Sequence, residues 1–259
     1  MTFFLPATAD NPYRPTAGAR EAGMAFASVM SEGFWASFSN PALLPSIDKT
    51  SFGAGYENRF GIKELSTRTA AIIIPAGMAS VGSFYSYFGY ADFRREMTGI
   101  SCGLPLSEKI SAGIQIDYFS EKTTGENLNT RIITFEAGVL LRFSESLTAG
   151  VHAFNPVPGA IRHFRMPSGL RAGIGSRLNS QLFAGLEVEM VTGMNPDLRA
   201  GLEYEIIKNF WIRGGYRTAS PSFSFGTGYV THHGKIDIAF STHEQLGITS
   251  NVSFIINIK

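Results

Sequence analysis

Most of the chain after Thr50 alternates apolar and polar residues with a period of two. In the stretch 134–143, TFEAGVLLRF, five apolar residues share one face, while Glu136 and Arg142 lie on the other. The stretches 110–118, 182–190 and 198–206 alternate in the same way. Successive side chains of a β-strand point to opposite faces, so this period indicates half-apolar strands. Each is about nine to eleven residues long, the length of a tilted strand that crosses a membrane.

A polar turn followed by an apolar-x-(Ala/Arg)-Gly strand start recurs along the chain. The four copies are LSEKISAGIQ, FSESLTAGVH, LNSQLFAGLE and IIKNFWIRGGY. Their spacing is roughly thirty residues, which equals two strands with their turns. About fourteen strands of about 15 residues each, connection included, fit between Thr50 and Lys259. The pattern therefore predicts an all-β, antiparallel up-and-down barrel.

The uncharged stretch 69–91, TAAIIIPAGMASVGSFYSYFGYA, is long enough to be a membrane-spanning helix. Its composition is against a helix, because Pro75, Gly77 and Gly82 stand in its middle and three tyrosines follow. Pro and Gly mark turns between strands. We therefore expect two strands joined by a turn at IIIPAGMAS.

Alternation alone does not say which face meets lipid, since a soluble sandwich or a lipocalin-like barrel has the same period. Three features favour a membrane barrel: 17% charged residues against roughly 25% in soluble domains, aromatic residues near strand ends, and glycines that share the polar face with Glu and Arg. We predict a transmembrane barrel in the outer membrane of a Gram-negative cell, surrounded by its lipid. The net charge of +1 does not favour nucleic acid as a partner. The single cysteine, Cys102, excludes an internal disulfide framework.

The N-terminal stretch GAREAGMAFASVMSEGFWASFSNPALL resembles the opening of the PorV/PorQ family of Bacteroidetes outer-membrane barrels, which are distant relatives of the fatty-acid transporter FadL. The segments PSGLRAGIG, PDLRAGLEYE, WIRGGYRTASPSFSFGTGY and IDIAFSTHEQLGIT resemble that family's closing strands. The resemblance implies a fourteen-stranded barrel whose residues 10–49 fold inward as a plug. It also implies a part in type IX secretion and surface attachment, whereas FadL passes hydrophobic solutes.

Two regions follow: an N-terminal segment, residues 1–49, and the barrel, residues 50–259. Ala7-Thr8-Ala9 fits a signal-peptidase site, so residues 1–9 are either the remnant of an export signal or an ordinary N-terminus. The conspicuous small and turn-forming residues of the plug have a structural interpretation, because they let a plug pack closely on the wall. They are Gly18, Arg20, Gly23, Asn40, Pro41 and Ala42.

Charged residues of both signs occupy the polar face of the predicted strands and would project into the lumen. This charge lattice consists of Glu136, Arg142, Arg171, Arg177, Glu187, Glu189, Arg199, Glu203, Glu205, Arg213 and Arg217. Unpaired buried charges are costly, so these residues should pair with one another and with the plug. The alternative is a selective polar pathway. Either interpretation fits poorly with an apolar tunnel.

Signals for catalysis are weak. GISCG, residues 99–103, matches G-x-S-x-G, but a nucleophile elbow needs a helix after Ser101, and a turn and another strand follow. The histidines have no zinc-site spacing; they are His152, His163, His232, His233 and His243. His243 matches the family's pattern without an assignable chemistry. We expect no enzymatic activity, no cofactor and no metal.

Two functions remain open. The first is a partner-binding component of a type IX-like secretion, attachment or outer-membrane assembly machine, with other membrane or periplasmic proteins as partners. The alternative is a FadL-like transporter of hydrophobic or small solutes, with bound lipid or fatty acid. Transport requires a continuous lumen or a lateral opening with an apolar pocket behind the plug. The sequence names neither partner nor substrate.

Overall fold

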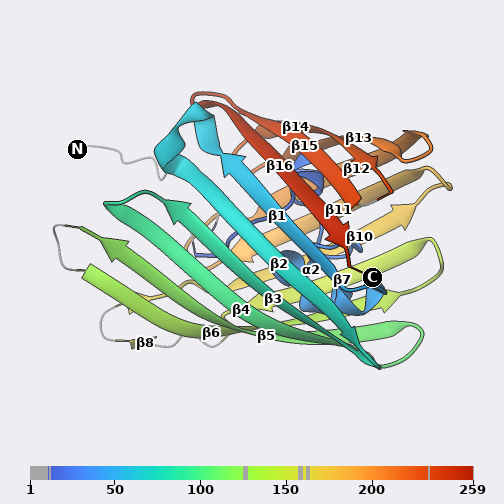
Figure 1. Ribbon diagram of the computed structural model, residues 1–259, viewed down its shortest axis with the longest axis horizontal. Helices are drawn as coiled ribbons and strands as arrows, with labels where there is room; N and C mark the ends of the chain where they lie inside the picture. Colours follow the sequence, from blue (N-terminus) through green and yellow to red (C-terminus); the bar gives the residue numbers. More distant parts are fainter. Residues whose placement is uncertain are drawn as a thin grey trace.

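The computed structural model describes residues 11, 13–124, 128–156, 160–161, 164–232 and 234–258, and its main body is a closed barrel (Figure 1). Fourteen antiparallel strands form it, each beside the next in sequence, except that β7 pairs with β10 and β1 closes the barrel against β16. The strands are β1 Ser51–Asn58, β2 Ser66–Ala76, β3 Ala79–Gly89, β4 Phe93–Pro105, β5 Ile110–Thr123, β6 Leu128–Arg142, β7 Leu147–Phe154, β10 Gly169–Arg177, β11 Leu182–Val191, β12 Asp197–Ile207, β13 Phe210–Arg217, β14 Ser222–Val230, β15 Gly234–His243 and β16 Gly247–Asn257. The predicted fold class is confirmed.

The outer face of the barrel is apolar and the inner face is polar, as the period of two predicts. On β12, Leu198 and Leu202 are more than half exposed on the outside, while Arg199 between them is 3% exposed. A closed barrel satisfies all its backbone hydrogen bonds between strands, so it can span a bilayer. With its apolar outer face and polar interior, this is the architecture of an integral outer-membrane protein. None of the helices in the described ranges is long and apolar enough to span a membrane.

The uncharged stretch 69–91 is the hairpin β2–β3, so the expectation of two strands is confirmed. The turn is Gly77-Met78, and Gly77 has a φ of +67°, a conformation that favours glycine. Strand β2 continues through Pro75, which pairs with Ser80. The turn is therefore tighter than the sequence indicated.

The two rims of the barrel differ in their connections. Short turns join β2–β3, β4–β5, β6–β7, β10–β11 and β12–β13 at one rim. The other rim carries the single-turn 3-10 helices η2 Arg59–Gly61 and η3 Lys63–Leu65 and the long β7–β10 connection, with its small strands β8 Ala160–Ile161 and β9 Phe164–Arg165. Outer-membrane barrels have short periplasmic turns and longer external loops. We therefore call the two the periplasmic rim and the outer rim.

Residues 13–49 lie inside the barrel and fill much of its lumen (Figure 1). Their short helices are α1 Ala19–Gly23, α2 Ala36–Ser39 and the 3-10 helix η1 Pro41–Ser46. Asn40 starts η1, because its Oδ1 accepts a hydrogen bond from the Ala42 N–H at 3.0 Å and Pro41 takes the first helical position. We call residues 13–49 the plug. Residues 1–9, with the predicted signal remnant, lie outside the described residues.

Candidate functional site

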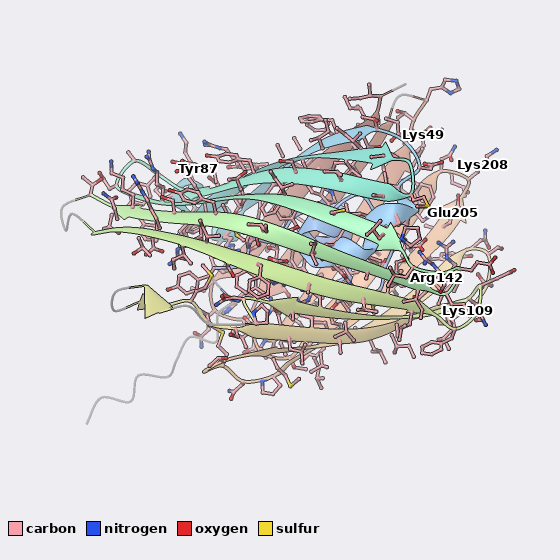
Figure 2. All side chains as sticks on the ribbon, turned by 90° about the horizontal axis from the view of Figure 1, so that it is seen from below. Lys49, Tyr87, Lys109, Arg142, Glu205 and Lys208 are labelled. Carbon is pink, nitrogen blue, oxygen red and sulfur yellow. The ribbon has the colours of Figure 1, made fainter. Side chains whose placement is uncertain are left out.

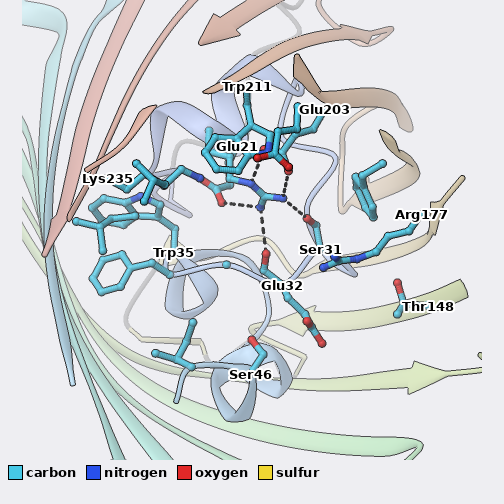
Figure 3. A pocket seen from close by; sticks show the side chains of 18 of the residues that line it. Glu21, Ser31, Glu32, Trp35, Ser46, Thr148, Arg177, Glu203, Trp211 and Lys235 are labelled. Carbon is cyan, nitrogen blue, oxygen red and sulfur yellow. Dashed lines mark hydrogen bonds and ion pairs between the residues drawn. The ribbon is translucent and has the colours of Figure 1, made fainter. Parts of the chain in front are cut away.

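The plug divides the lumen into cavities of very different size. The largest, about 830 Å³, opens at the periplasmic rim, and we call it the vestibule (Figure 3). A pocket of about 50 Å³ lies near the outer rim, and a void of about 10 Å³ lies between the two. Arg14 and Thr16 line both the outer pocket and the void, and Glu21 lines both the void and the vestibule. The cavities thus follow one another along the lumen, and plug residues separate them.

Arg20 of α1 ties the plug to the barrel wall at the inner end of the vestibule. Its Nε and Nη2 donate to the two carboxylate oxygens of Glu203 on β12, at 2.9 and 2.8 Å. Nη2 also donates to Ser31 Oγ at 3.0 Å, and Nη1 donates to the Glu32 carbonyl at 3.2 Å (Figure 3). A bidentate arginine–carboxylate pair fixes both position and orientation. Arg20 therefore holds α1 against β12.

Burial and charge act in opposite directions on the two ionisable residues of α1. Burial opposes the charge on Arg20, but Glu203 beside it holds the pKa of the guanidinium above its ordinary value. Burial raises the pKa of the Glu21 carboxyl, and Arg20 offsets part of that increase. Glu21 Oε1 is 3.5 Å from Arg20 Nη1, a longer contact than those of Glu203. Glu203 is thus the main counter-ion of Arg20.

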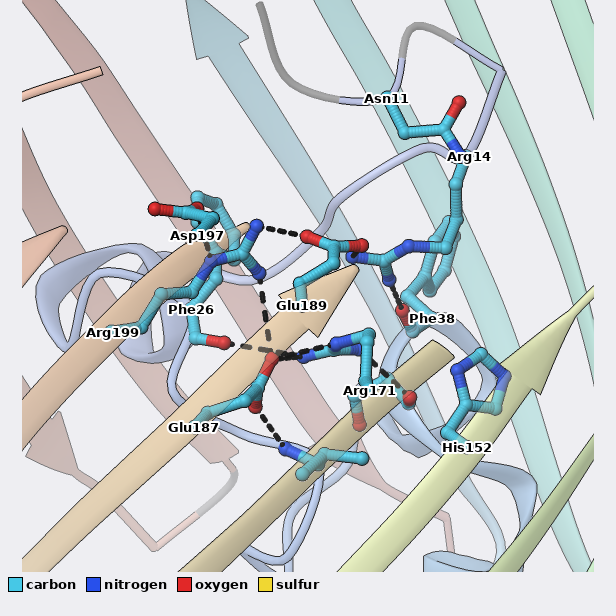
Figure 4. A network of polar contacts seen from close by, with 12 residues as sticks. Asn11, Arg14, Phe26, Phe38, His152, Arg171, Glu187, Glu189, Asp197 and Arg199 are labelled. Atoms are coloured by element: carbon cyan, nitrogen blue, oxygen red, sulfur yellow. Dashed lines mark hydrogen bonds and ion pairs between the residues drawn. The ribbon is translucent and has the colours of Figure 1, made fainter. Parts of the chain in front are cut away.

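A second network joins the plug to β10, β11 and β12 deeper in the lumen (Figure 4). Arg171 donates to Glu187 at 2.7 Å and to the Ser39 carbonyl of the plug at 2.9 Å. The other oxygen of Glu187 accepts the backbone N–H groups of Ser28 and Val29, each at 2.8 Å. The wall and the plug therefore satisfy each other's buried polar groups, as buried charges require.

The same network continues toward the outer rim. Glu189 accepts from Arg14 of the plug at 3.2 Å and from Arg199. Asp197 bridges Arg199 and Arg217, at 2.8 and 2.6 Å. These guanidinium and carboxylate groups alternate around the wall, so that opposite charges are adjacent.

The remaining residues of the predicted lattice also face the lumen. Glu136 contacts His152 Nε2 at 2.7 Å, and Arg142 pairs with Glu32 of the plug at 2.9 Å. Arg213 pairs with Glu203 at 2.6 Å. Arg177 and Glu205 line the vestibule instead; within the described residues Arg177 has no ion pair. The lattice is therefore mostly paired, and these two members are exceptions.

The sequence interpretation missed several members of these networks. Asp197 continues the polar face of β12, whose other charges were identified, and Asp237 lies on the lumen face of β15, so the period of two could have found both. Asp237 pairs with Arg213 at 2.8 Å. Arg14, Glu21 and Glu32 lie in the plug, where no period marks the buried face. Pairing between plug and wall is visible only in three dimensions.

An uninterrupted apolar cluster connects the outer pocket to the vestibule along the β2–β6 side of the plug. Met97 and Phe119 line the outer pocket, and Phe34 and Trp35 line the vestibule. All four belong to one buried cluster, together with Phe38, Phe84 and Ile73. Ring centroids are 4.4 Å apart for Phe38–Phe84, 5.8 Å for Trp35–Phe38 and 5.0 Å for Phe34–Trp35. We call this cluster the apolar seam. Its side chains pack against one another and leave no open passage.

The outer pocket combines aromatic and cationic side chains. Tyr13 of the plug packs edge-on against Phe119 at 5.6 Å, and the Arg95 guanidinium lies over the Tyr13 ring at 5.4 Å. Arg95 also pairs with Glu121. The apolar rings and the paired charge make the pocket amphipathic.

The predicted plug residues occupy closely packed positions, either within the plug or between the plug and the wall. Gly18 has a φ of +92°, and a Cβ there would lie 2.0 Å from Glu21 Oε2 and 2.3 Å from the Trp35 ring. A Cβ on Gly23 would lie 3.1 Å from the Cα atom of Gly226 on β14. Asn40 donates to the Val29 carbonyl at 2.8 Å, within the plug. A Cβ on Gly113 of β5 would lie 2.3 Å from the backbone of Pro41.

The weak catalytic signals have structural explanations. Ser101 lies inside β4, and its Oγ contacts Ser37 Oγ of the plug at 3.0 Å, so the strand–turn–helix of a nucleophile elbow is not formed there. His243 Nδ1 accepts from the N–H groups of Gln245 and Leu246, at 3.2 and 3.3 Å, and so shapes the β15–β16 turn. His163 and His233 lie outside the described residues. Across the described ranges, no three His, Cys, Asp or Glu side chains are grouped to hold a metal ion.

Comparison with solved structures shows the fold. The toluene transporter TbuX of Ralstonia pickettii superimposes with a TM-score of 0.77 at 12% identity, over 96% of this chain and 100% of that chain. The toluene transporter TodX of Pseudomonas putida gives 0.71 at 11% identity, over 92% and 96%. A FadL homologue of Pseudomonas aeruginosa gives 0.70 at 13% identity, over 95% and 99%. No protein-family model and no curated protein matches the sequence.

The chain therefore has the fourteen-stranded outer-membrane barrel fold of the FadL and TodX proteins. This fold supports the FadL part of the sequence resemblance. It gives no support to PorV/PorQ membership or to a type IX machine in particular, and those remain expectations from sequence. At 11–13% identity, these comparisons show the fold alone.

Proposed function

We propose that this protein is a non-enzymatic outer-membrane channel for small hydrophobic compounds, with the plug as its gate. The observation that carries the proposal is the apolar seam, a continuous cluster of buried apolar side chains that joins the outer pocket to the vestibule. The likeness to toluene transporters and to a FadL homologue supports the same class of solute. Of the two functions that the sequence left open, transport is the better supported.

The charge lattice is compatible with such a channel because most of it occupies the other side of the lumen. Its ion pairs lie mainly on β10 to β13 and on the facing plug surface, and Glu136 and Arg142 of β6 are the exceptions. The apolar seam faces β2 to β6. The lattice then has a structural role, holding one side of the plug in place. The argument that charged residues exclude an apolar route applies to a uniform lumen, and this lumen is divided.

Passage requires movement of the plug. The outer pocket holds about 50 Å³, whereas a cavity of about 150 Å³ is needed to hold one benzene. A solute that enters must therefore separate Phe38 from Phe84, or Trp35 from its neighbours. Such contacts are non-directional, so they can open without leaving unpaired polar groups.

Tryptophan fluorescence tests solute binding at the seam. Both tryptophans, Trp35 and Trp211, line the vestibule, so a Trp211→Phe variant isolates the signal of Trp35. We expect toluene to change the Trp35 emission with a saturable dose dependence. The matched Trp35→Phe variant, which retains Trp211, should show no saturable change. A dependence on toluene that stays linear in both variants would argue against a binding route. Co-purification of a stoichiometric protein partner would instead favour the machine hypothesis.

A further inference from the structure

Basic side chains gather on the lipid-facing side of β2 to β6, close to the outer rim. Arg68, Lys122 and Arg131 are exposed there, and 40% of the Arg94 side chain is exposed. We call these four residues the basic patch. Tyr87 marks this end of the barrel in Figure 2. The Cζ atom of Arg68 lies over the Tyr87 ring, 5.7 Å from the ring centroid. Tyrosines at this level are typical of the boundary between lipid and water.

The strand register places three of the four basic residues in neighbouring rows. Arg94 of β4 pairs with Lys122 of β5, and Ser120, two residues before Lys122, pairs with Arg131 of β6. Side chains on one face of a strand recur every second residue, about 7 Å apart. Arg94, Lys122 and Arg131 therefore surround one spot on the outer wall.

The carboxylate of Glu96 lies within this region. Glu96 accepts from the Tyr85 hydroxyl at 3.2 Å and is 4.0 Å from Arg94. Within the described residues, Lys122 and Arg131 have no ion-pair partner. The basic patch thus keeps an excess of positive charge at a lipid-facing surface.

An apolar groove of about 520 Å³ lies directly below the basic patch on the same outer wall. Its upper row is formed by Thr98, Tyr118 and Ile133, which the register makes cross-strand neighbours. This row is the one next to Arg131, toward the middle of the membrane. Ile100 and Ile116 continue the groove downward, and both are more than 60% exposed. A cationic spot above an apolar groove matches the shape of a lipid with an anionic headgroup.

We propose that the basic patch and the groove form a binding site for a phosphorylated lipid of the outer leaflet, of the lipopolysaccharide type. The headgroup phosphate contacts Arg94, Lys122 and Arg131, and one acyl chain occupies the groove. The position at the outer rim favours an outer-leaflet lipid over a phospholipid of the inner leaflet. Each basic residue near an anionic lipid surface strengthens binding about fivefold.

The test measures lipopolysaccharide bound to the purified full-length barrel. The double variant Lys122→Gln/Arg131→Gln should weaken binding about 25-fold. The matched control is Lys109→Gln/Lys208→Gln, which removes two exposed lysines from the opposite rim (Figure 2) and should bind like the unmodified chain. The variant Lys122→Arg/Arg131→Lys keeps both charges and should also retain binding. Electrophoresis checks that each variant is folded, because an unheated, folded barrel migrates faster than the same chain after heating.

Several outcomes would overturn the proposal. If Lys122→Gln/Arg131→Gln and Lys109→Gln/Lys208→Gln lose lipopolysaccharide binding equally, the effect of charge is non-specific. Unchanged binding in folded Lys122→Gln/Arg131→Gln would exclude the basic patch as the site. If phosphatidylglycerol vesicles bind as tightly as lipopolysaccharide and show the same dependence on these two residues, the lipid is a phospholipid and the assigned source is wrong. A Thr98→Trp variant, which fills the groove, should weaken lipopolysaccharide binding as well, and full binding by that variant would exclude the groove.

Discussion

The plug meets the two sides of the barrel wall in different ways. Toward β10 to β13 it is held by charge-assisted hydrogen bonds such as Arg20–Glu203 and by Glu187 with the Ser28 and Val29 amides. Toward β2 to β5 it packs mainly through rings, as Phe38 does on Phe84. The first kind of contact is directional and costly to break, because separation leaves buried charges unpaired. The second can slide. Under the proposed function, the plug pivots on its ionic side and opens on its apolar side.

Loss of one central carboxylate should have the largest effect, because it acts on the ionic side. Glu187→Gln removes the charge that faces both Arg171 and Arg199. We expect the free energy of unfolding to fall by about 3–5 kcal/mol, the cost of leaving buried charges unpaired. Urea unfolding in detergent measures it. Glu145→Gln, in an exposed turn, is the control and should change stability by less than about 0.5 kcal/mol. A loss below about 1 kcal/mol for Glu187→Gln would contradict the pivot.

An added methyl group on the apolar side should have a smaller effect. The Cβ of Gly113→Ala would lie 2.3 Å from the Pro41 backbone, so the plug must shift, at a cost of about 1–3 kcal/mol. Gly214→Ala on β13 is the matched control, because nothing lies within 4 Å of its added Cβ. We expect the unfolding free energy to fall only in Gly113→Ala. Equal stability of the two variants would show that the plug does not pack against β5 as described.

The smallest expected effect depends on pH. Burial raises the pKa of Glu21 above its ordinary value of 4.5. The unfolded chain therefore ionises first as pH rises, and the fold loses stability from about pH 4.5 up to the folded pKa, above which the penalty is complete. Glu21→Gln should be more stable than the unmodified chain at pH 7, by roughly 1 kcal/mol, and equally stable at pH 4. The urea midpoints of the two chains at pH 4 and at pH 7 measure this difference in stability. If Glu21→Gln is less stable than the unmodified chain at pH 7, the prediction is wrong.

The sequence predicts the wall of this molecule much better than its interior. A strand that separates lipid from a polar lumen must alternate apolar and polar side chains. Residue types such as Leu198 and Arg199 therefore indicate directly which face of the wall they occupy. The partners of the lumen charges depend on strand register and on the plug. Arg20 was identified as a structural plug residue, but its partner Glu203 could not be inferred. The plug has no repeating pattern, because it packs against wall on all sides.

The apolar seam shows the same limit. Phe34, Trp35 and Phe38 stand in the segment without a period, and Phe84 lies within an almost uniformly apolar stretch. Their contact brings together residues about fifty positions apart, which no local pattern encodes. For that reason the charge lattice, which is visible in the sequence, argues more strongly against an apolar route than the divided lumen does.

The most direct test of the central claim, that the plug gates an apolar route, is to tether the plug on its apolar side. Ser37 of the plug and Ser101 of β4 have their Oγ atoms 3.0 Å apart, so Ser37→Cys/Ser101→Cys in a Cys102→Ser background can be crosslinked. Uptake of radiolabelled toluene by cells that produce this variant should fall at least about tenfold on oxidation and recover on reduction. The Cys102→Ser chain alone should not respond. Equal uptake by the oxidised and reduced forms of the crosslinked variant would contradict the account.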